Sequence, residues 1–195
     1  MNARLRSLSL LAVLTLALPV LAAPNEAVVK PVKTVVQSVR YNKDDIALKQ
    51  LANEAQGRFL LGDAWTQGTE AQRKEFTRLF TSLFAKMAFP KVRENFKNLA
   101  SITYEDPKVE GDTAKVGSTI VIDHPVKKQE MKLQYTVTKD GGAWKVVDVA
   151  VLGDSMLTGI RDDQIKPIMK DGGWDNLLKL MREKEAELAK ATAKK

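Results

Sequence analysis

The most constraining feature of this chain is a change in the spacing of its apolar residues near position 100. Before that point apolar side chains recur every three or four residues, as on one face of a helix. The longest such stripe consists of Phe76, Leu79, Phe80, Leu83, Phe84 and Met87. After that point the spacing becomes two, as in Met131, Leu133, Tyr135 and Val137, which is typical of a strand with one covered face.

The spacing predicts strands that follow one another directly along the chain, over residues 101–105, 114–123, 128–138 and 144–152. Helical spacing precedes them over residues 31–39, 43–61, 69–90 and 92–99, and returns after Ser155 and again after Trp174. Consecutive strands joined by short turns pair in an antiparallel meander. We therefore predict an α+β fold, with an antiparallel sheet of about four strands wrapped by N- and C-terminal helices.

Local signals set several element ends. Thr69 and Gln72 have the spacing of a capping box, so a helix should begin there. Pro90 should end or kink that helix, and Gly172 and Gly173 should stop a later one.

The last predicted strand is apolar on both faces. Strict alternation places Trp144, Val146 and Asp148 on one face, and Val147, Val149 and Val151 on the other. A strand of this kind is covered on both sides or lines a cavity.

The N-terminus has the pattern of an export signal. Arg4 and Arg6 precede an apolar run over residues 8–18, and Ala22 offers a cleavage site. We expect residues 1–22 to be a signal peptide, residues 23–190 a single domain, and residues 191–195 a basic flexible tail. The run is too short to span a bilayer, and the chain has no cysteine, so disulfides and thiol chemistry are excluded.

The formal net charge is +7, which favours solubility or docking to an anionic surface. We do not expect nucleic-acid binding, because the basic residues form no compact cluster interleaved with aromatic ones.

Catalytic motifs are weak. His124 is the only histidine, and the block Gly153-Asp154-Ser155-Met156 is similar to the Gly-Asp-Ser-Leu block of an esterase family. That family carries its histidine after the block, whereas His124 precedes it, so we interpret the block as a strand end followed by a helix cap. One histidine without cysteine also gives no metal site, and we expect no cofactor.

Asp148 is the remaining candidate for chemistry. A carboxylate on this strand should be paired or hydrogen-bonded. It could serve as an acid or base in a pocketed α+β enzyme, or as a structural anchor to Arg161 or to a backbone cap. A third alternative is an interaction module with a solid core and no internal cavity.

Two segments together resemble the MlaC family, the toluene-tolerance auxiliary proteins of phospholipid ABC transporters. The first is Trp144-Lys145-Val146-Val147-Asp148-Val149, followed by Gly153-Asp154-Ser155, Arg161 and the segment from Gly173 to Leu178. The second is Leu61-Gly62-Asp63-Ala64-Trp65 with the segment from Thr69 to Phe76. The chain departs from the family where many members carry Glu and Val around the glycine, since Leu152 and Asp154 stand there.

The resemblance implies a monomeric periplasmic carrier with an apolar pocket between sheet and helices. It would exchange phospholipid with the membrane-anchored substrate-binding and permease components of an ABC transporter, between the outer and inner membranes, and so maintain outer-membrane lipid asymmetry. The resemblance implies no catalysis. From face and side-chain length we predict these lipid-contacting residues: Phe80, Phe84, Met87, Trp144, Val147, Val149, Val151, Met156 and Ile160.

Overall fold

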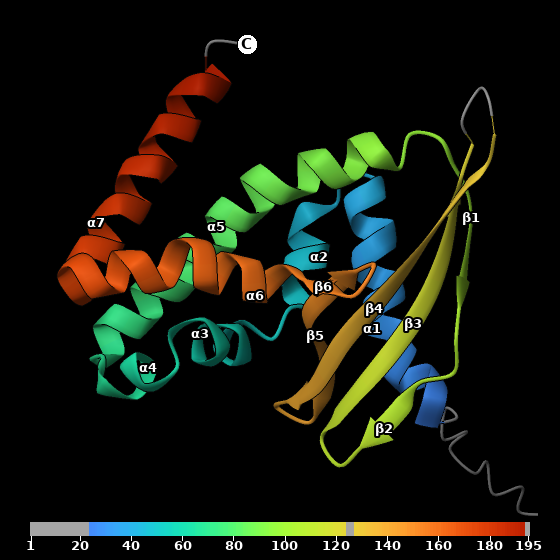
Figure 1. Cartoon of the computed structure of the whole chain (residues 1–195), viewed down its shortest axis with the longest axis horizontal. Coiled ribbons are helices and arrows are strands. Elements are labelled where there is room, and N and C mark those ends of the chain that lie inside the picture. The colour runs from blue at the N-terminus through green and yellow to red at the C-terminus, as the bar shows by residue number, and fades with distance from the viewer. Residues whose placement is uncertain (1–23, 124–126, 194–195) are drawn as a thin grey trace, which may run out of the picture.

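The computed structural model describes residues 24–123 and 127–193, and it has the predicted α+β architecture. The predicted signal peptide and His124 lie outside the described residues. In Figure 1 the N-terminal helices and the C-terminal helices lie on the same side of a curved sheet.

The N-terminal half is helical. Its helices are α1 (Pro24–Arg40), α2 (Asp44–Lys49), α3 (Asn53–Leu61), α4 (Asp63–Gln67) and α5 (Glu70–Asn95). The C-terminal helices are α6 (Met156–Ile160), the π-helical turn η1 (Arg161–Ile165) and α7 (Lys166–Ala193).

The sheet lies between these groups in the sequence. Its strands are β1 (Leu99–Tyr104), β2 (Lys108–Glu110), β3 (Thr113–Ile122), β4 (Gln129–Asp140), β5 (Ala143–Val151) and β6 (Asp154–Ser155). All pairings are antiparallel, in the order β1-β3-β4-β5-β6, with β2 beside the start of β3. The four predicted strands are confirmed, and the short strands β2 and β6 were not predicted.

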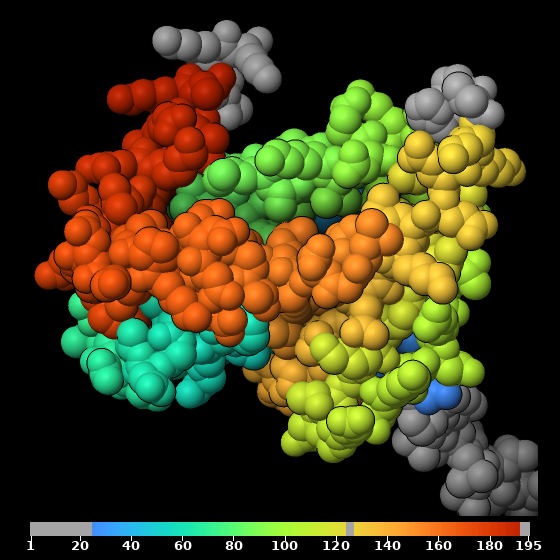
Figure 2. All heavy atoms as spheres, viewed as in Figure 1, coloured from blue at the N-terminus to red at the C-terminus, as the bar shows by residue number. Residues whose placement is uncertain are grey.

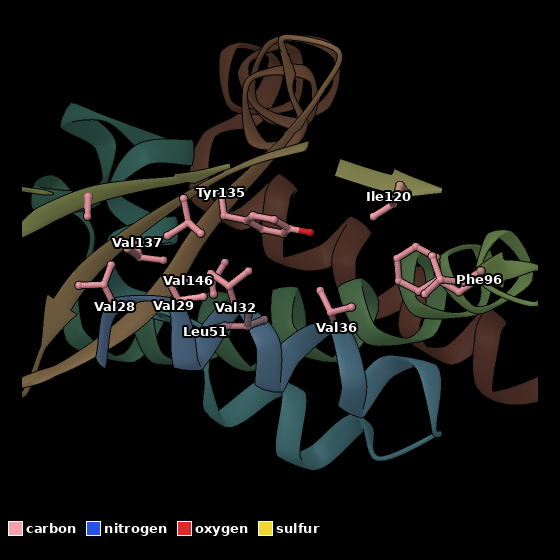
Figure 3. Close-up of a cluster of buried hydrophobic side chains, with 13 residues drawn as sticks. Val28, Val29, Val32, Val36, Leu51, Phe96, Ile120, Tyr135, Val137 and Val146 are labelled. Atoms are coloured by element: carbon pink, nitrogen blue, oxygen red, sulfur yellow. The ribbon is translucent and has the colours of Figure 1, made fainter. Parts of the chain in front are cut away.

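The helix that covers the sheet begins earlier than predicted. We expected a helix over residues 31–39, but α1 starts at Pro24 and continues through Pro31. Val28 and Val32 are fully buried against the sheet, and their burial offsets the cost of a proline inside the helix. Figure 3 shows the valines of α1 facing Tyr135, Val137 and Val146.

A single helix over residues 43–61 was also predicted, and this prediction is wrong. The chain leaves helical geometry between α2 and α3, where Leu51 forms a parallel bridge with Val146. The Ala52 amide donates to the Val146 carbonyl, and the Val146 amide donates to the Gln50 carbonyl, each at 2.8 Å. These bonds tie the helical half of the chain to β5.

Helix α5 begins as predicted, because Thr69 and Gln72 form a complete capping box. Pro90, however, does not end the helix, which continues to Asn95. Phe89 and Phe96 on either side of the proline are buried, and this packing holds the last turns in place.

The predicted stop at Gly172 and Gly173 is a sharp bend inside α7. Gly173 has a φ of 59° and a ψ of −150°, a backbone conformation that is essentially restricted to glycine. The bend places Trp174 against the helical core, where its indole nitrogen donates to the Ala64 carbonyl at 3.1 Å.

Two large apolar cores and a small third cluster of Val39, Ala47 and Phe89 result from this arrangement. The sheet core joins α1 to β3, β4 and β5, and the helical core joins α3, α4, α5, α6 and α7. Phe84 contacts both cores but is only partly buried. The space between the two cores contains the candidate site.

Candidate lipid-binding cavity

Two neighbouring cavities separate the sheet core from the helical core. The smaller has a volume of about 170 Å³ and the larger about 600 Å³. They share walls formed by α5, β5 and α6, through residues that include Phe84, Val92, Val151 and Met156. In Figure 2 the surface is hollowed between α5, in green, and α6, in orange.

The smaller cavity lies between α1, the end of α5 and the covered face of the sheet. Its walls are almost entirely aliphatic or aromatic, and Val35, Val36 and Val39 of α1 face Met131, Leu133 and Tyr135 of β4 across it. An apolar ligand that covers these walls would gain roughly 25 cal/mol per Å² of apolar surface removed from water.

The larger cavity lies between α5, the α6–η1 segment and α7, and it opens to solvent. Phe80 and Leu177 lie at buried positions in its wall, whereas Met87 and Leu180 are 44% and 38% exposed at its rim. The inner part of the larger cavity is therefore buried and apolar, and its rim is exposed and also apolar.

Eight of the nine predicted lipid-contacting residues line these cavities. Val147 and Val149 line the smaller one, and Phe80, Met87 and Ile160 line the larger. Three residues line both, namely Phe84, Val151 and Met156. Their contact with lipid remains a prediction.

Trp144 lines neither cavity. It is half-buried at the edge of the sheet core, and its ring lies 5.4 Å from the Lys139 ammonium. The sequence pattern showed that Trp144 belongs to the apolar strand. It did not show which part of that strand borders the cavities.

The predicted side-chain alternation of β5 is wrong, because the strand contains a bulge. The register changes so that Asp148 pairs with Thr136 while Val146 pairs with Val137, which leaves Val147 without a partner on β4. Val146, Val149 and Val151 therefore share the covered face, and Asp148 lies on the face opposite Val146.

Sequence reasoning missed the cavity walls supplied by α1, β3 and β4. The missed residues include Val35, Val36, Val39, Ile120, Met131, Leu133 and Tyr135, together with Phe89 and Val92 near the end of α5. Their apolar periodicity was visible in the sequence, but it signals burial equally well for a solid core and for a cavity wall.

Few polar residues line the smaller cavity, namely Gln56, Asn95, Tyr135 and Asp148. The Gln56 side chain is 3% exposed, and its nitrogen donates to the Val147 carbonyl at 2.8 Å. Its oxygen is buried without a hydrogen-bond partner in the described part of the chain. Tyr135 accepts a bond from the Ser118 hydroxyl, and burial raises the pKa of the Tyr135 hydroxyl above its ordinary value.

Asp148 is a structural anchor. One carboxylate oxygen accepts from the Ser155 hydroxyl at 2.5 Å, and the other accepts from the Leu157 amide at 3.0 Å. Ser155 caps α6, since its hydroxyl accepts from the Thr158 amide. The predicted anchor to a backbone cap is therefore confirmed. The alternative partner, Arg161, pairs with Asp162 instead.

No cluster of histidine or carboxylate side chains in residues 24–123 and 127–193 has the arrangement of a metal site. Within the same residues, no helix is both long enough and apolar enough to cross a bilayer.

Comparisons with known proteins bear on this geometry. A family model described as MlaC protein matches residues 32–183, most of the chain. No curated protein sequence matches.

Two solved structures are similar. A phospholipid-binding protein from Ralstonia solanacearum, solved in complex with a phospholipid, has a TM-score of 0.68 and 20% sequence identity. That match covers 86% of this chain and 99% of the Ralstonia chain, and it shows a shared fold. A variant of a protein named Rd1NTF2_05 has a TM-score of 0.41 and 15% identity, over 66% of this chain and 99% of its own, and carries no weight here.

Proposed function

The chain belongs to the MlaC family, and from this premise we propose that it is a phospholipid carrier. The observation that carries the proposal is the pair of apolar cavities between the sheet and the helices, the larger of which opens to solvent. The acyl chains would occupy the cavities, and the headgroup would lie at the exposed rim near Met87 and Leu180.

The free energy of transferring acyl chains is consistent with a carrier. Each methylene group transferred from water to an apolar wall gains about 0.8 kcal/mol, so acyl chains bind without any charged clamp in the interior. A lipid that leaves a membrane exchanges one apolar environment for another, so the net change is small. A small net change allows both loading and release.

Support for a phospholipid cargo comes from the Ralstonia protein, which shares the fold and was solved with a phospholipid bound. Half-buried aliphatic residues on β5 and α6 also support a cavity that accepts a ligand, because a solid core would bury them fully.

The wider role is part of the proposal. The predicted signal peptide would export the chain to the periplasm, where residues 23–190 would act as one monomeric domain. The carrier would exchange phospholipid with membrane-anchored substrate-binding and permease components of an ABC transporter, and so contribute to outer-membrane lipid asymmetry. Catalysis and nucleic-acid binding form no part of this role.

Blocking the cavity tests the proposal. We expect Val149→Trp to fill the smaller cavity and Phe84→Asp to place a charge where both cavities meet, so that each variant takes up far less phospholipid from vesicles. A matched control is Val109→Trp on β2, where the side chain is 46% exposed and lines neither cavity.

Lipid uptake is measured by mass spectrometry on re-isolated protein, and circular dichroism establishes that each variant is folded. Wild-type uptake by folded Val149→Trp and Phe84→Asp would contradict the proposed site. Reduced uptake by these two variants alone would support it.

A further inference from the structure

The mouth of the larger cavity has a repeated pattern on two helices. On α5, Phe84 and Met87 line the cavity and Lys91 follows Met87 by one turn. On α7, Leu177 and Leu180 line the cavity and Lys184 follows Leu180 by one turn. Each helix therefore places one lysine in the cavity wall, one turn beyond an exposed apolar residue.

The charged side chains that line the larger cavity are both positive. Lys91 and Lys184 are the only charged residues among the described residues that line the larger cavity, and its other polar residues are Asn95 and Gln164. No described carboxylate lines it. Cationic groups at the edge of a low-dielectric cleft concentrate positive potential there.

Both lysines are available to a ligand. Lys91 is exposed and forms no ion pair with any residue in the described ranges. Lys184 pairs with Glu187 at 2.9 Å, but the Glu187 side chain is 66% exposed. An exposed pair of this kind contributes little, so a ligand anion can replace Glu187 at low cost.

We propose that Lys91 and Lys184 make this mouth selective for phospholipids with a net negative headgroup over zwitterionic ones. The inference rests on the proposed function, because it assumes that acyl chains occupy the cavities. The exposed apolar residues Met87 and Leu180 would contact the glycerol end of the lipid, and the two ammonium groups would lie beside its headgroup.

A competition within one membrane tests this selectivity. The protein is incubated with vesicles of phosphatidylglycerol and phosphatidylethanolamine with matched acyl chains, re-isolated, and analysed for bound lipid by mass spectrometry. Both lipids share each vesicle, so docking of the protein to an anionic surface exposes it to both equally. The ratio in the protein relative to the vesicle therefore reports headgroup selection.

We expect wild-type protein to be enriched in phosphatidylglycerol about fivefold, which corresponds to about 1 kcal/mol from two exposed charge contacts. The double substitution Lys91→Gln and Lys184→Gln should bring the ratio to that of the vesicle. The double substitution Lys91→Arg and Lys184→Arg should preserve the enrichment. Lys179 is exposed on α7 and does not line the cavity, so Lys179→Gln should behave as wild type.

Glu187→Gln provides a test in the opposite direction. It releases Lys184 from its ion pair, so the enrichment should rise above that of wild type. The inference is overturned if wild-type protein binds the two lipids in the vesicle ratio, or if the double glutamine variant keeps the enrichment. Absence of bound lipid in every variant, wild type included, would instead contradict the proposed function.

Discussion

At the scale of single residues, Asp148 connects β5 to α6. Its two oxygens accept hydrogen bonds from the Ser155 hydroxyl and the Leu157 amide. The carboxylate therefore holds the N-terminus of α6, the helix that forms one cavity wall. Hydrogen bonds to a charged group contribute about 1.5 to 3 kcal/mol.

We expect Asp148→Asn to lower the free energy of unfolding by about 1 to 3 kcal/mol, because the amide keeps one acceptor oxygen and loses the charge. Urea denaturation measures the change, and Asp106→Asn, an exposed aspartate between β1 and β2, is the control. The folded variant should still take up lipid. Unchanged stability together with loss of an enzymatic turnover would contradict the anchoring role and favour the acid–base alternative.

Tyr135 gives a prediction for alkaline pH. Burial raises the pKa of its hydroxyl in the folded protein, while the unfolded chain titrates near pH 10. The unfolded state therefore binds fewer protons above about pH 10, and stability should fall there by up to about 1.4 kcal/mol per pH unit. Below that pH the contribution of this group is fully present.

Denaturation curves between pH 8 and pH 11 check this slope. Tyr135→Phe should give a shallower decline than wild type, because the titrating group is removed. Tyr41→Phe, at a position that is 64% exposed, should decline as steeply as wild type. Equal slopes for Tyr135→Phe and wild type would show that this hydroxyl does not govern the decline.

At the scale of elements, α5 is the helix that both cores share, and its start is set by the capping box. The Thr69 amide donates to the Gln72 side chain at 2.8 Å, and the Gln72 amide donates to the Thr69 hydroxyl at 3.2 Å. The aromatic side chains of the helix then contact one another in sequence, with Phe76–Phe80 and Phe80–Phe84 ring centres 5.7 and 5.8 Å apart.

We expect Thr69→Ala to lower the free energy of unfolding by about 1 kcal/mol, since the first turn loses a side-chain acceptor for a backbone amide. Thr81→Ala is the matched control, because Thr81 lies inside α5 and its hydroxyl donates back to the Thr77 carbonyl of the same helix. Thr81→Ala should change the free energy of unfolding very little. A Thr69→Ala variant as stable as wild type would contradict the capping role.

Elements of this size were largely predictable from sequence where one period dominates. The stripe from Phe76 to Met87 and the alternation from Met131 to Val137 each match an observed element. The errors lie where a long-range contact overrides the local pattern. The Leu51–Val146 bridge divides a predicted helix, and the bulge at Val147 shifts half of β5 to the other face.

At the scale of the whole molecule, the sheet core and the helical core meet only partly, and the cavities occupy the space that remains. The sequence predicted the apolar residues of this region, including Phe84 and Val151, because apolar side chains reveal burial. It could not predict which of them enclose an empty space, since the walls come from α1, α5, β4 and α6 and depend on how these pack. Trp144 illustrates the difference, because it belongs to the same apolar strand yet lines neither cavity.

The central claim is that these cavities hold phospholipid. The most direct measurement is native mass spectrometry of the exported chain, purified from the periplasm without detergent. The account predicts a mass equal to the processed chain plus bound phospholipid at near-stoichiometric amount, with the lipid identified after release. A bare polypeptide mass that persists after incubation with phospholipid vesicles would contradict it.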